Sequence, residues 1–259
     1  MNLTTDLVLC LTASIDPQGM PGVSRPDPKA RETDYAECLQ FYSEQFPQVQ
    51  RIVFIENSGW PLDRLRHIAS TCNPHRKRFE FISLRCNDFP RELGKSYGEL
   101  MLMDRGLEQS ELARDARYLA KLTGRNYLLN LTQILERVRR EFQLLCDLRD
   151  HPLYEWLRIP ACGRHADTRF IVFTPELYNR HVRGQYVRCS EALGFHAENL
   201  FYEIAKDPAL ASEVIPRFSV EPRYRGIAGH LNKDYGSRRE RLKQVVRGAG
   251  RRIMPWLRI

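Results

Sequence analysis

The sequence has no run of about eighteen apolar residues, the length that a membrane-spanning helix needs. Its opening stretch, MNLTTDLVLCLTAS, has no basic segment ahead of the apolar residues, and these are interrupted by threonine. We therefore expect a first β-strand here and no secretory signal peptide. The 42% share of hydrophobic residues and 28% share of charged residues are ordinary for a globular protein, and 259 residues can enclose a sizeable core.

No Cys-x-x-Cys pair occurs either, and the seven cysteines are an odd number scattered along the chain. This pattern is typical of reduced thiols in a cytosolic protein. A zinc site would have to combine cysteines with His75, His165 or His196, and the ligand spacing that such a site needs is missing. We expect no zinc site.

The net charge of +8 is concentrated at one end of the chain. Residues 223–259 hold eleven Lys or Arg and two Asp or Glu, a net charge of +9. The remaining residues hold 29 basic and 30 acidic side chains, a net charge of −1. We therefore divide the chain into a near-neutral main domain, residues 1–222, and a basic C-terminal tail, residues 223–259.

The tail has the pattern of an amphipathic helix. Apolar residues recur at helical spacing, and basic residues fill most of the other positions. The apolar stripe comprises Leu242, Val245, Val246, Ala249 and Ile253, extended by Met254, Trp256 and Leu257. Such a helix can lie in a lipid headgroup layer, so we expect residues 238–259 to bind an anionic membrane surface at the cytoplasmic face. Two alternatives are packing of the stripe on the main domain and, without a recognisable motif for it, nucleic-acid binding.

The main domain alternates strands with helices, which predicts an α/β fold with an open sheet. We expect strands over residues 7–14, 51–56, 79–84, 118–122 and 169–173. We expect helices over residues 31–45, 61–70, 96–109, 130–148, 175–182 and 198–206. Residues 1–130 form a Rossmann-like nucleotide-binding half in this interpretation, and residues 131–222 form an acceptor half.

Ligands of open α/β sheets bind beyond the carboxyl ends of the strands, so the loops after the strands are the candidate site. The first loop contains Asp16, Arg25, Asp27 and Arg31, which suit a clamp on phosphate and ribose. The alternative is an ordinary solvated loop. The second is Glu56, Asn57, Ser58 and Gly59, which suits a nucleoside because a carboxylate accepts hydrogen bonds from ribose and Gly59 permits close approach. The alternative is a glycine turn with a helix cap.

Two further loops carry cations next to glycines. Residues 94–99, GKSYGE, open a helix whose N-terminus could hold phosphate. Lys95, Tyr97, Gly98 and Glu99 are its candidate residues, although the spacing is not that of a Walker A loop. Residues 121–125, KLTGR, end the fourth strand, and their candidates are Lys121, Thr123, Gly124 and Arg125. A guanidinium such as that of Arg125 pairs with phosphate oxygens in a fork.

The order of these segments resembles bacterial glycosyltransferases that build lipopolysaccharide and capsule. The shared pattern is a strand followed by "DP" and "R-x-D", a strand ending "ENSG", a helix opening "GK-x-YGE" and a strand ending "TGR". It falls here on residues 16–17, 25–27, 56–59, 94–99 and 123–125. The resemblance implies a GT-A-like fold. It departs from that plan at residues 123–125, where an Asp-x-Asp that binds a metal ion usually stands, and no Asp-x-Asp occurs anywhere in the sequence.

The resemblance therefore implies a metal-independent enzyme without a cofactor, in which Arg125, Lys95 and Lys121 stabilise the leaving nucleotide. It also implies a carboxylate base for an inverting reaction, at the start of a helix in the second half. Glu198 is the candidate; its alternative role is an acid favoured by the helix dipole, and His196 is the next candidate. His230 is a candidate phosphate contact.

We thus expect a cytoplasmic glycosyltransferase that moves a sugar from a nucleotide-sugar donor to a lipopolysaccharide-core, lipid-linked or capsular acceptor at the inner membrane face. One alternative is another nucleotide-dependent transferase, such as a nucleotidyltransferase, which usually needs Mg²⁺ held by carboxylates. The other is a non-catalytic module that binds membrane or nucleic acid through the tail, with no role for the cationic loops.

Overall fold

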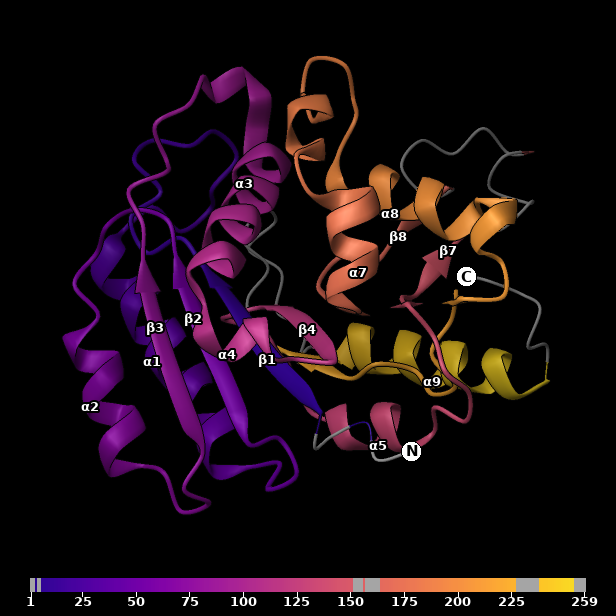
Figure 1. Ribbon diagram of the computed structural model, residues 1–259, viewed down its shortest axis with the longest axis horizontal. Coiled ribbons are helices and arrows are strands. Elements are labelled where there is room, and N and C mark those ends of the chain that lie inside the picture. The colour runs from indigo at the N-terminus through magenta and orange to yellow at the C-terminus, as the bar shows by residue number, and fades with distance from the viewer. Residues whose placement is uncertain (1–2, 4–5, 151–155, 157–163, 227–237, 254–259) are drawn as a thin grey trace.

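A seven-stranded sheet forms the centre of the molecule (Figure 1). The computed structural model describes residues 3, 6–150, 156, 164–226 and 238–253. The strand order is β10-β6-β9-β4-β1-β2-β3, and all neighbours are parallel except those of β9. The strands are β1 (Leu7–Ala13), β2 (Arg51–Glu56), β3 (Arg78–Ser83), β4 (Tyr118–Thr123), β6 (Leu144–Leu145), β9 (Phe170–Phe173) and β10 (Val214–Ile215).

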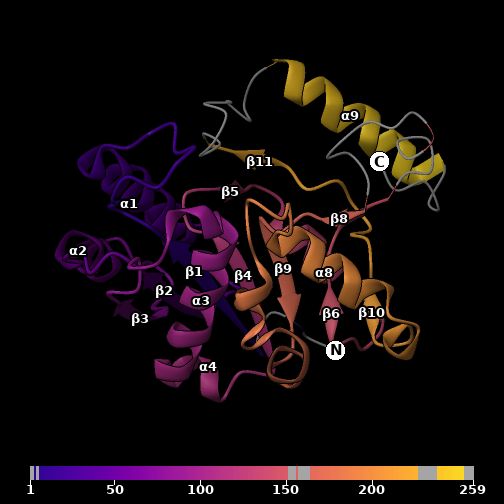
Figure 2. The ribbon, with the colours of Figure 1, turned by 90° about the horizontal axis from the view of Figure 1, so that it is seen from above.

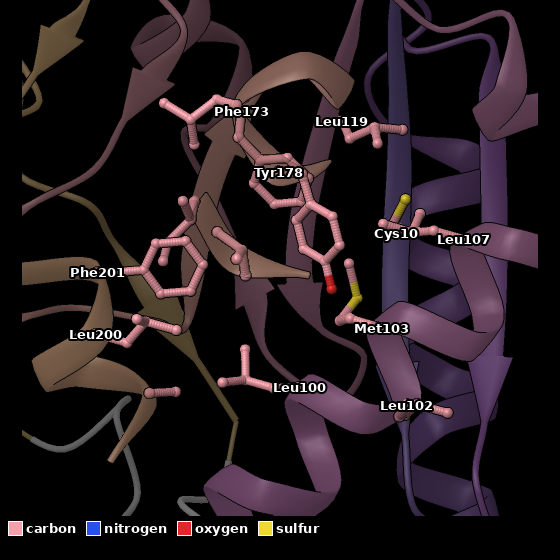
Figure 3. Close-up of a cluster of buried hydrophobic side chains, with 14 of the residues drawn as sticks. Cys10, Leu100, Leu102, Met103, Leu107, Leu119, Phe173, Tyr178, Leu200 and Phe201 are labelled. Carbon is pink, nitrogen blue, oxygen red and sulfur yellow. The ribbon is translucent and has the colours of Figure 1, made fainter. Parts of the chain in front are cut away.

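Helices cover both faces of this sheet, because the strand residues are apolar on both sides. Along β1, Val8 and Cys10 belong to one buried cluster, and Leu7, Leu9 and Leu11 belong to the other. The first cluster includes residues of α3 (Gly94–Gln109) and α8 (Ala197–Lys206), and the second includes residues of α1 (Pro28–Glu44) and α5 (Leu131–Glu136). Figure 3 shows the first cluster, in which side chains from β1, α3, β9 and α8 converge.

The structure confirms the predicted α/β alternation of the first half. The strand predicted over residues 51–56 is β2, and the other four predicted strands agree with β1, β3, β4 and β9 to within one residue at each end. The helices α1, α2 (Asp63–Thr71), α3 and α8 begin and end within three residues of their predicted bounds. The helix predicted over residues 175–182 is α7 (Pro175–Leu177) followed by a π-helical turn, η2 (Tyr178–Val182).

The single helix predicted over residues 130–148 is wrong. Only α5 is helical, and the chain then forms β6 and β7 (Leu148–Arg149). The apolar residues from Phe142 onward fit a helical stripe and a buried strand equally well. The strand is formed because Leu144 and Leu145 pair with β9 on one side and β10 on the other, which satisfies their backbone groups inside the core.

The second half adds two small sheets beside the main one. β7 pairs with β8 (His165–Ala166), and β5 (Tyr127–Leu128) pairs with β11 (Tyr224–Arg225). The pairing of β11 connects the first residues of the basic segment to the main domain. Figure 2 shows α3 and α8 on the same side of the sheet, where α8 also packs against β8.

The tail contains a helix, α9 (Arg238–Ile253), that continues through Gly248 and Gly250 and lies at the periphery of the molecule (Figure 2). Its Arg251 side chain points inward and is 7% exposed, whereas Val245 and Ile253 are 68% and 72% exposed. The predicted stripe residues Met254, Trp256 and Leu257 lie outside the described residues, as does His230. Among the helices that the structure describes, none is both long and apolar enough to cross a membrane.

Candidate active site

A cavity of about 970 Å³ lies beyond the carboxyl ends of β1, β2 and β4. Its floor includes Thr12 and Ala13 at the end of β1, and Thr123 at the end of β4. One side comes from α3, and the opposite side comes from β8 and the first turn of α8. The volume suits a nucleotide sugar, because pockets for small molecules and cofactors typically enclose about 300–1,000 Å³.

The structure brings about half of the predicted site residues to this cavity. Those that line it are Arg31, Asn57, Lys95, Gly98, Glu99, Thr123, Arg125, His196 and Glu198. The predicted residues that do not line it are Asp16, Arg25, Asp27, Glu56, Ser58, Gly59, Tyr97, Lys121 and Gly124. Several of this second group shape the loops that carry the first.

Glu56 organises the loop after β2. Its carboxylate is fully buried and accepts hydrogen bonds from the backbone N–H groups of Ile15 at 3.0 Å, Ser58 at 2.9 Å and Trp60 at 3.1 Å. The neighbouring Asn57 is 6% exposed and lines the cavity, and its side-chain Oδ1 has no hydrogen-bond partner within the described part of the chain. A buried amide oxygen that is not satisfied by the protein is suited to accept a hydrogen bond from a ligand.

The first loop is held by its charged residues, and of the four predicted ones Arg31 alone lines the cavity. Asp27 caps the N-terminus of α1 by accepting from the N–H groups of Lys29 and Ala30. Arg25 forms an ion pair with Asp34 at 3.2 Å. Arg31 is 4% exposed and donates from Nε to the Ser14 carbonyl at 2.8 Å, which fixes its guanidinium beside the end of β1.

Lys95 adds a second cation to this part of the cavity. Its Nζ donates to the Gly22 carbonyl at 2.6 Å. Burial lowers the pKa of Lys95, and the positive charges of Arg125 and Arg31 lower it further, against the opposing effect of Glu191. The three cations are therefore close enough to repel one another, and a bound anion would relieve that repulsion.

Gly98 and Glu99 of the same helix have different roles. A Cβ on Gly98 would come within 2.6 Å of the Phe89 ring, so this glycine lets the helix pack closely. Glu99 forms an ion pair with Lys121 at 2.5 Å. Lys121, which is 6% exposed, also donates to the Thr168 carbonyl at 2.7 Å. Its ammonium group is therefore already paired with groups of the protein.

Arg125 has the geometry expected of a ligand-binding cation. It is the second residue after β4, and a Cβ on the preceding Gly124 would lie 2.9 Å from the Thr12 carbonyl, so the chain turns tightly against β1 here. The Arg125 Nε and Nη1 atoms are buried and have no hydrogen-bond partner in the part of the chain that the structure describes. Buried donors without partners are costly, and phosphate oxygens would satisfy them.

Glu198 lies in the first turn of α8 on the opposite side of the cavity. The Thr168 hydroxyl donates to its Oε1 at 3.0 Å, which orients the carboxylate. His196 also lines the cavity. Its backbone N–H donates to the Asn199 side chain at 2.9 Å, which caps the N-terminus of α8.

Sequence reasoning missed the segment just before β9. Arg149, His165, Asp167, Thr168 and Arg169 all line the cavity. We searched residues that follow strands, but β9 is antiparallel to β4, so the residues preceding β9 lie at the same edge as those following β4. The Thr123 N–H donates to the Arg169 carbonyl at 3.1 Å, which fixes this arrangement. The alternating charges of Asp167-Thr168-Arg169 were a signal that could have been used.

Searches with the sequence find no matching protein-family model and no matching curated protein. Solved structures do match in three dimensions. Core-mannan synthase A from Aspergillus fumigatus aligns with a TM-score of 0.52 and 8% identity, over 86% of this chain and 75% of that chain. The glycosyltransferase GlyE of Streptococcus pneumoniae aligns with a TM-score of 0.50 and 9% identity, over 82% of this chain but 45% of its own.

A third match is the inositol-1-phosphate CTP transferase from T. maritima, with a TM-score of 0.52, 12% identity, and coverage of 89% of this chain and 92% of that chain. The fold is therefore a GT-A-like α/β fold with a Rossmann-like sheet, and both a glycosyltransferase-type and a CTP-transferase structure align with it. At these identities the likeness defines the fold, and the activity has to be argued from the site.

Proposed function

We propose that this protein is a glycosyltransferase that moves a sugar from a nucleotide-sugar donor to a saccharide acceptor. The observation that carries the proposal is Arg125, whose buried Nε and Nη1 donors lack partners among the described residues beside the cavity. Arg31 and Lys95 join it to form a cationic region suited to a diphosphate, and Asn57 offers an unsatisfied acceptor for the nucleoside. The GT-A-like fold agrees with this assignment.

We also propose that the reaction needs no divalent metal ion. Core-mannan synthase A was solved in a Mn/GDP form. In this chain residues 123–125 are Thr-Gly-Arg, and the described residues hold no group of three or more His, Cys, Asp or Glu suited to a metal. Four carboxylates line the cavity. Glu99 pairs with Lys121 and Asp167 pairs with Arg169, while Glu198 accepts from Thr168 and Glu191 acts electrostatically on Lys95. These residues do not fit a metal ion, and the cations replace its charge.

In an inverting transfer, Glu198 would take the proton of the acceptor hydroxyl as the hydroxyl oxygen bonds to the anomeric carbon. The bond between that carbon and the donor phosphate oxygen breaks at the same time. The negative charge that develops on the departing nucleoside diphosphate is then stabilised by Arg125 and Lys95. Thr168 keeps Glu198 oriented through its hydrogen bond.

For the acceptor we propose a lipopolysaccharide-core, lipid-linked or capsular saccharide at the cytoplasmic membrane face. Residues 223–259 carry a net charge of +9, and α9 presents Val245 and Ile253 outward while Arg251 is buried. An exposed apolar stripe on a basic segment suits contact with an anionic lipid surface. A phosphate contact from His230, which the structure does not describe, remains part of the same proposal.

The test is a thermal-shift panel of nucleotides and nucleotide sugars, run with EDTA and with Mg²⁺ or Mn²⁺. A ligand at a hundred times its Kd stabilises the fold by about 2.7 kcal/mol. We expect one nucleotide class to raise Tm equally in EDTA and in metal. A shift seen only with metal would contradict metal independence, and no shift with any nucleotide would contradict the proposed activity.

A nucleotidyltransferase is the second candidate, favoured by the structural match to the inositol-1-phosphate CTP transferase. It would release pyrophosphate from a nucleoside triphosphate and a sugar phosphate in the presence of Mg²⁺. Against it, the described residues hold no group of three or more His, Cys, Asp or Glu that could bind such a metal ion. A coupled pyrophosphate assay separates the two, because sugar transfer from a nucleotide sugar releases none.

A further inference from the structure

Lys121 is a buried charge between the two helices that form opposite sides of the cavity. Side chains alternate along a strand, so Lys121 lies on the same face of β4 as Leu119. Leu119 belongs to the buried cluster of Figure 3, which includes residues of α3 and α8. Lys121 itself is buried and does not line the cavity. It can therefore affect a bound ligand only through other residues.

The ammonium group of Lys121 contacts both sides of the cavity. On one side it pairs with Oε1 of Glu99 in α3 at 2.5 Å. On the other side it donates to the backbone carbonyl of Thr168 at 2.7 Å. The Thr168 hydroxyl in turn donates to Oε1 of Glu198, in the first turn of α8, at 3.0 Å. A continuous series of contacts thus connects α3 to Glu198 through Lys121.

The contacts of Lys121 leave its ammonium group little capacity for a ligand. An ammonium group has three N–H donors, and Glu99, the Thr168 carbonyl and the Thr123 hydroxyl, at 3.5 Å, can accept all of them. Glu99 is held in turn, because the Thr12 hydroxyl of β1 donates to the same Oε1 at 3.3 Å. Lys121 is therefore fixed to the floor of the cavity before any ligand binds.

The Thr168 carbonyl depends on Lys121 because of its place in the chain. The backbone contacts between β4 and the segment before β9 reach the Arg169 carbonyl, which accepts from the Thr123 N–H at 3.1 Å. Thr168 lies one residue beyond that contact, and its carbonyl accepts from the Lys121 side chain instead. The ammonium group thus orients the residue whose hydroxyl orients Glu198.

The Cys189 thiol indicates that Glu99 and Glu198 approach the same region between the two helices. The pKa of this thiol is raised to about 11, mainly by burial and then by the negative charges of Glu198 and Glu99, against the effect of Arg188. Two carboxylates that act on one thiol also repel each other. The positive charge of Lys121 between them opposes this repulsion.

We propose that Lys121 is a positioning residue, which holds Glu198 in the orientation that sugar transfer requires by fixing Thr168. This inference rests on the proposed function, since it takes Glu198 as the base. It gives Lys121 a different role from the one expected from the sequence, which was direct stabilisation of the leaving nucleotide. A base that is displaced by about 1 Å can cost about 10²-fold in rate, so a residue outside the cavity can control turnover.

The test measures turnover and nucleotide affinity separately on the full chain, with the nucleotide sugar that raises Tm. Lys121→Met is combined with Glu99→Gln, so that no unpaired carboxylate is left at the cavity. We expect kcat to fall by about 10–100-fold and the Kd of the nucleotide to stay unchanged. Lys121→Arg should recover most of kcat, because its guanidinium can still donate to Glu99 and Thr168. An unchanged kcat in the double variant would overturn the proposal, and so would a loss confined to nucleotide affinity.

The Glu198→Gln background shows whether Lys121 acts through the base. The same pair of substitutions should cause no further loss of kcat there, because no base remains to be misplaced. A further loss as large as that in the wild-type background would overturn the positioning role.

Lys77→Met is the matched control for the loss of a buried lysine. Lys77 is 4% exposed, donates to the carbonyls of Tyr42 at 2.6 Å and Gln45 at 2.7 Å, and does not line the cavity. Its substitution should lower Tm and leave kcat unchanged in assays well below the melting temperature. If Lys77→Met lowers kcat as much as the Lys121 variant, the loss reflects general destabilisation and the proposal falls.

The same assays separate this inference from the proposed function. A wild-type protein that transfers no sugar from any nucleotide sugar contradicts the proposed function. A wild-type protein that does transfer sugar, with an unchanged kcat when Lys121 and Glu99 are replaced, contradicts the positioning role alone.

Discussion

Thr168 Oγ1 donates a hydrogen bond to Glu198 Oε1 at 3.0 Å, which joins the segment before β9 to the first turn of α8. The two residues are thirty positions apart in the chain, yet they meet at the cavity. This contact gives the carboxylate one orientation. Substitutions at this contact, at Arg125 with its buried Nε and Nη1 atoms, and at the buried Arg251 have expected outcomes that can be measured.

Glu198→Gln should lower kcat by about 10²–10⁴-fold, because the amide cannot accept the proton of the acceptor hydroxyl. The KM for the donor and Tm should change little, since the amide can still accept from Thr168. Thr168→Val is the companion variant, and we expect a smaller loss of about tenfold in kcat from a carboxylate that is present but less well oriented. Steady-state kinetics with the nucleotide sugar found by thermal shift measure both. Full activity in Glu198→Gln would rule out the assigned base.

Arg125→Gln should weaken nucleotide binding by about 10–100-fold, the usual effect of losing a charge-assisted hydrogen bond worth roughly 1.5–3 kcal/mol. The unliganded protein should not lose stability, because the substitution removes buried donors that have no partners among the described residues. Calorimetric titration and a melting curve measure the two effects separately. Arg64→Gln serves as control, because that arginine is exposed and contacts Glu32 and Thr33 outside the cavity. A large loss of Tm in Arg125→Gln would instead indicate a structural role.

Arg251→Met should destabilise the fold by about 3–5 kcal/mol, because two buried carboxylates lose their counter-ion. Arg251 pairs with Asp147 at 2.6 Å and with Glu221 at 2.5 Å, and all three side chains are at most 7% exposed. Arg252→Met is the matched control, because Arg252 is next to Arg251 on the same helix but is exposed. Urea unfolding of both variants measures the difference.

The pH dependence of that loss has a definite sign. Burial raises the pKa of Glu221 in the folded protein, and Arg251 opposes this effect. Without Arg251 the pKa should rise further, so the folded state binds more protons than the unfolded state above the ordinary carboxyl pKa. The stability of Arg251→Met should therefore fall as pH rises from about 5 to 8, relative to wild type. An equal deficit at both pH values would contradict this account.

The first half of the fold could be predicted from the sequence because its signals are local. Residues 51–56 form a short apolar run that ends at a turn, and β2 has the same bounds. The secondary structure of residues 142–148 could not be predicted from local signals. Their apolar spacing fits a helix, and only pairing with β9 and β10, which come later in the chain, makes a strand of Leu144–Leu145.

The candidate site was predictable where a loop follows a parallel strand, as at Asn57 and Arg125. Residue type alone could not separate ligand-binding groups from loop-forming ones. Glu56 and Asp27 looked like ligand contacts, but their carboxylates accept backbone N–H groups of their own loops. Asp167, Thr168 and Arg169 were missed because the direction of β9 is a property of the sheet and cannot be seen in the local sequence.

Asp147 connects the tail to the cavity, because it contacts both Arg251 of α9 and Asp167. Its carboxylate holds Arg251 of α9, while its backbone carbonyl accepts from the N–H of Asp167 at 2.9 Å. A protein shortened before Arg238 would lack Arg251 and leave the buried carboxylates of Asp147 and Glu221 uncompensated beside Asp167, and its activity would fall for reasons unrelated to lipid. Single outward substitutions such as Val245→Ser and Ile253→Ser leave Arg251 in place, so vesicle sedimentation of these variants separates membrane attachment from turnover.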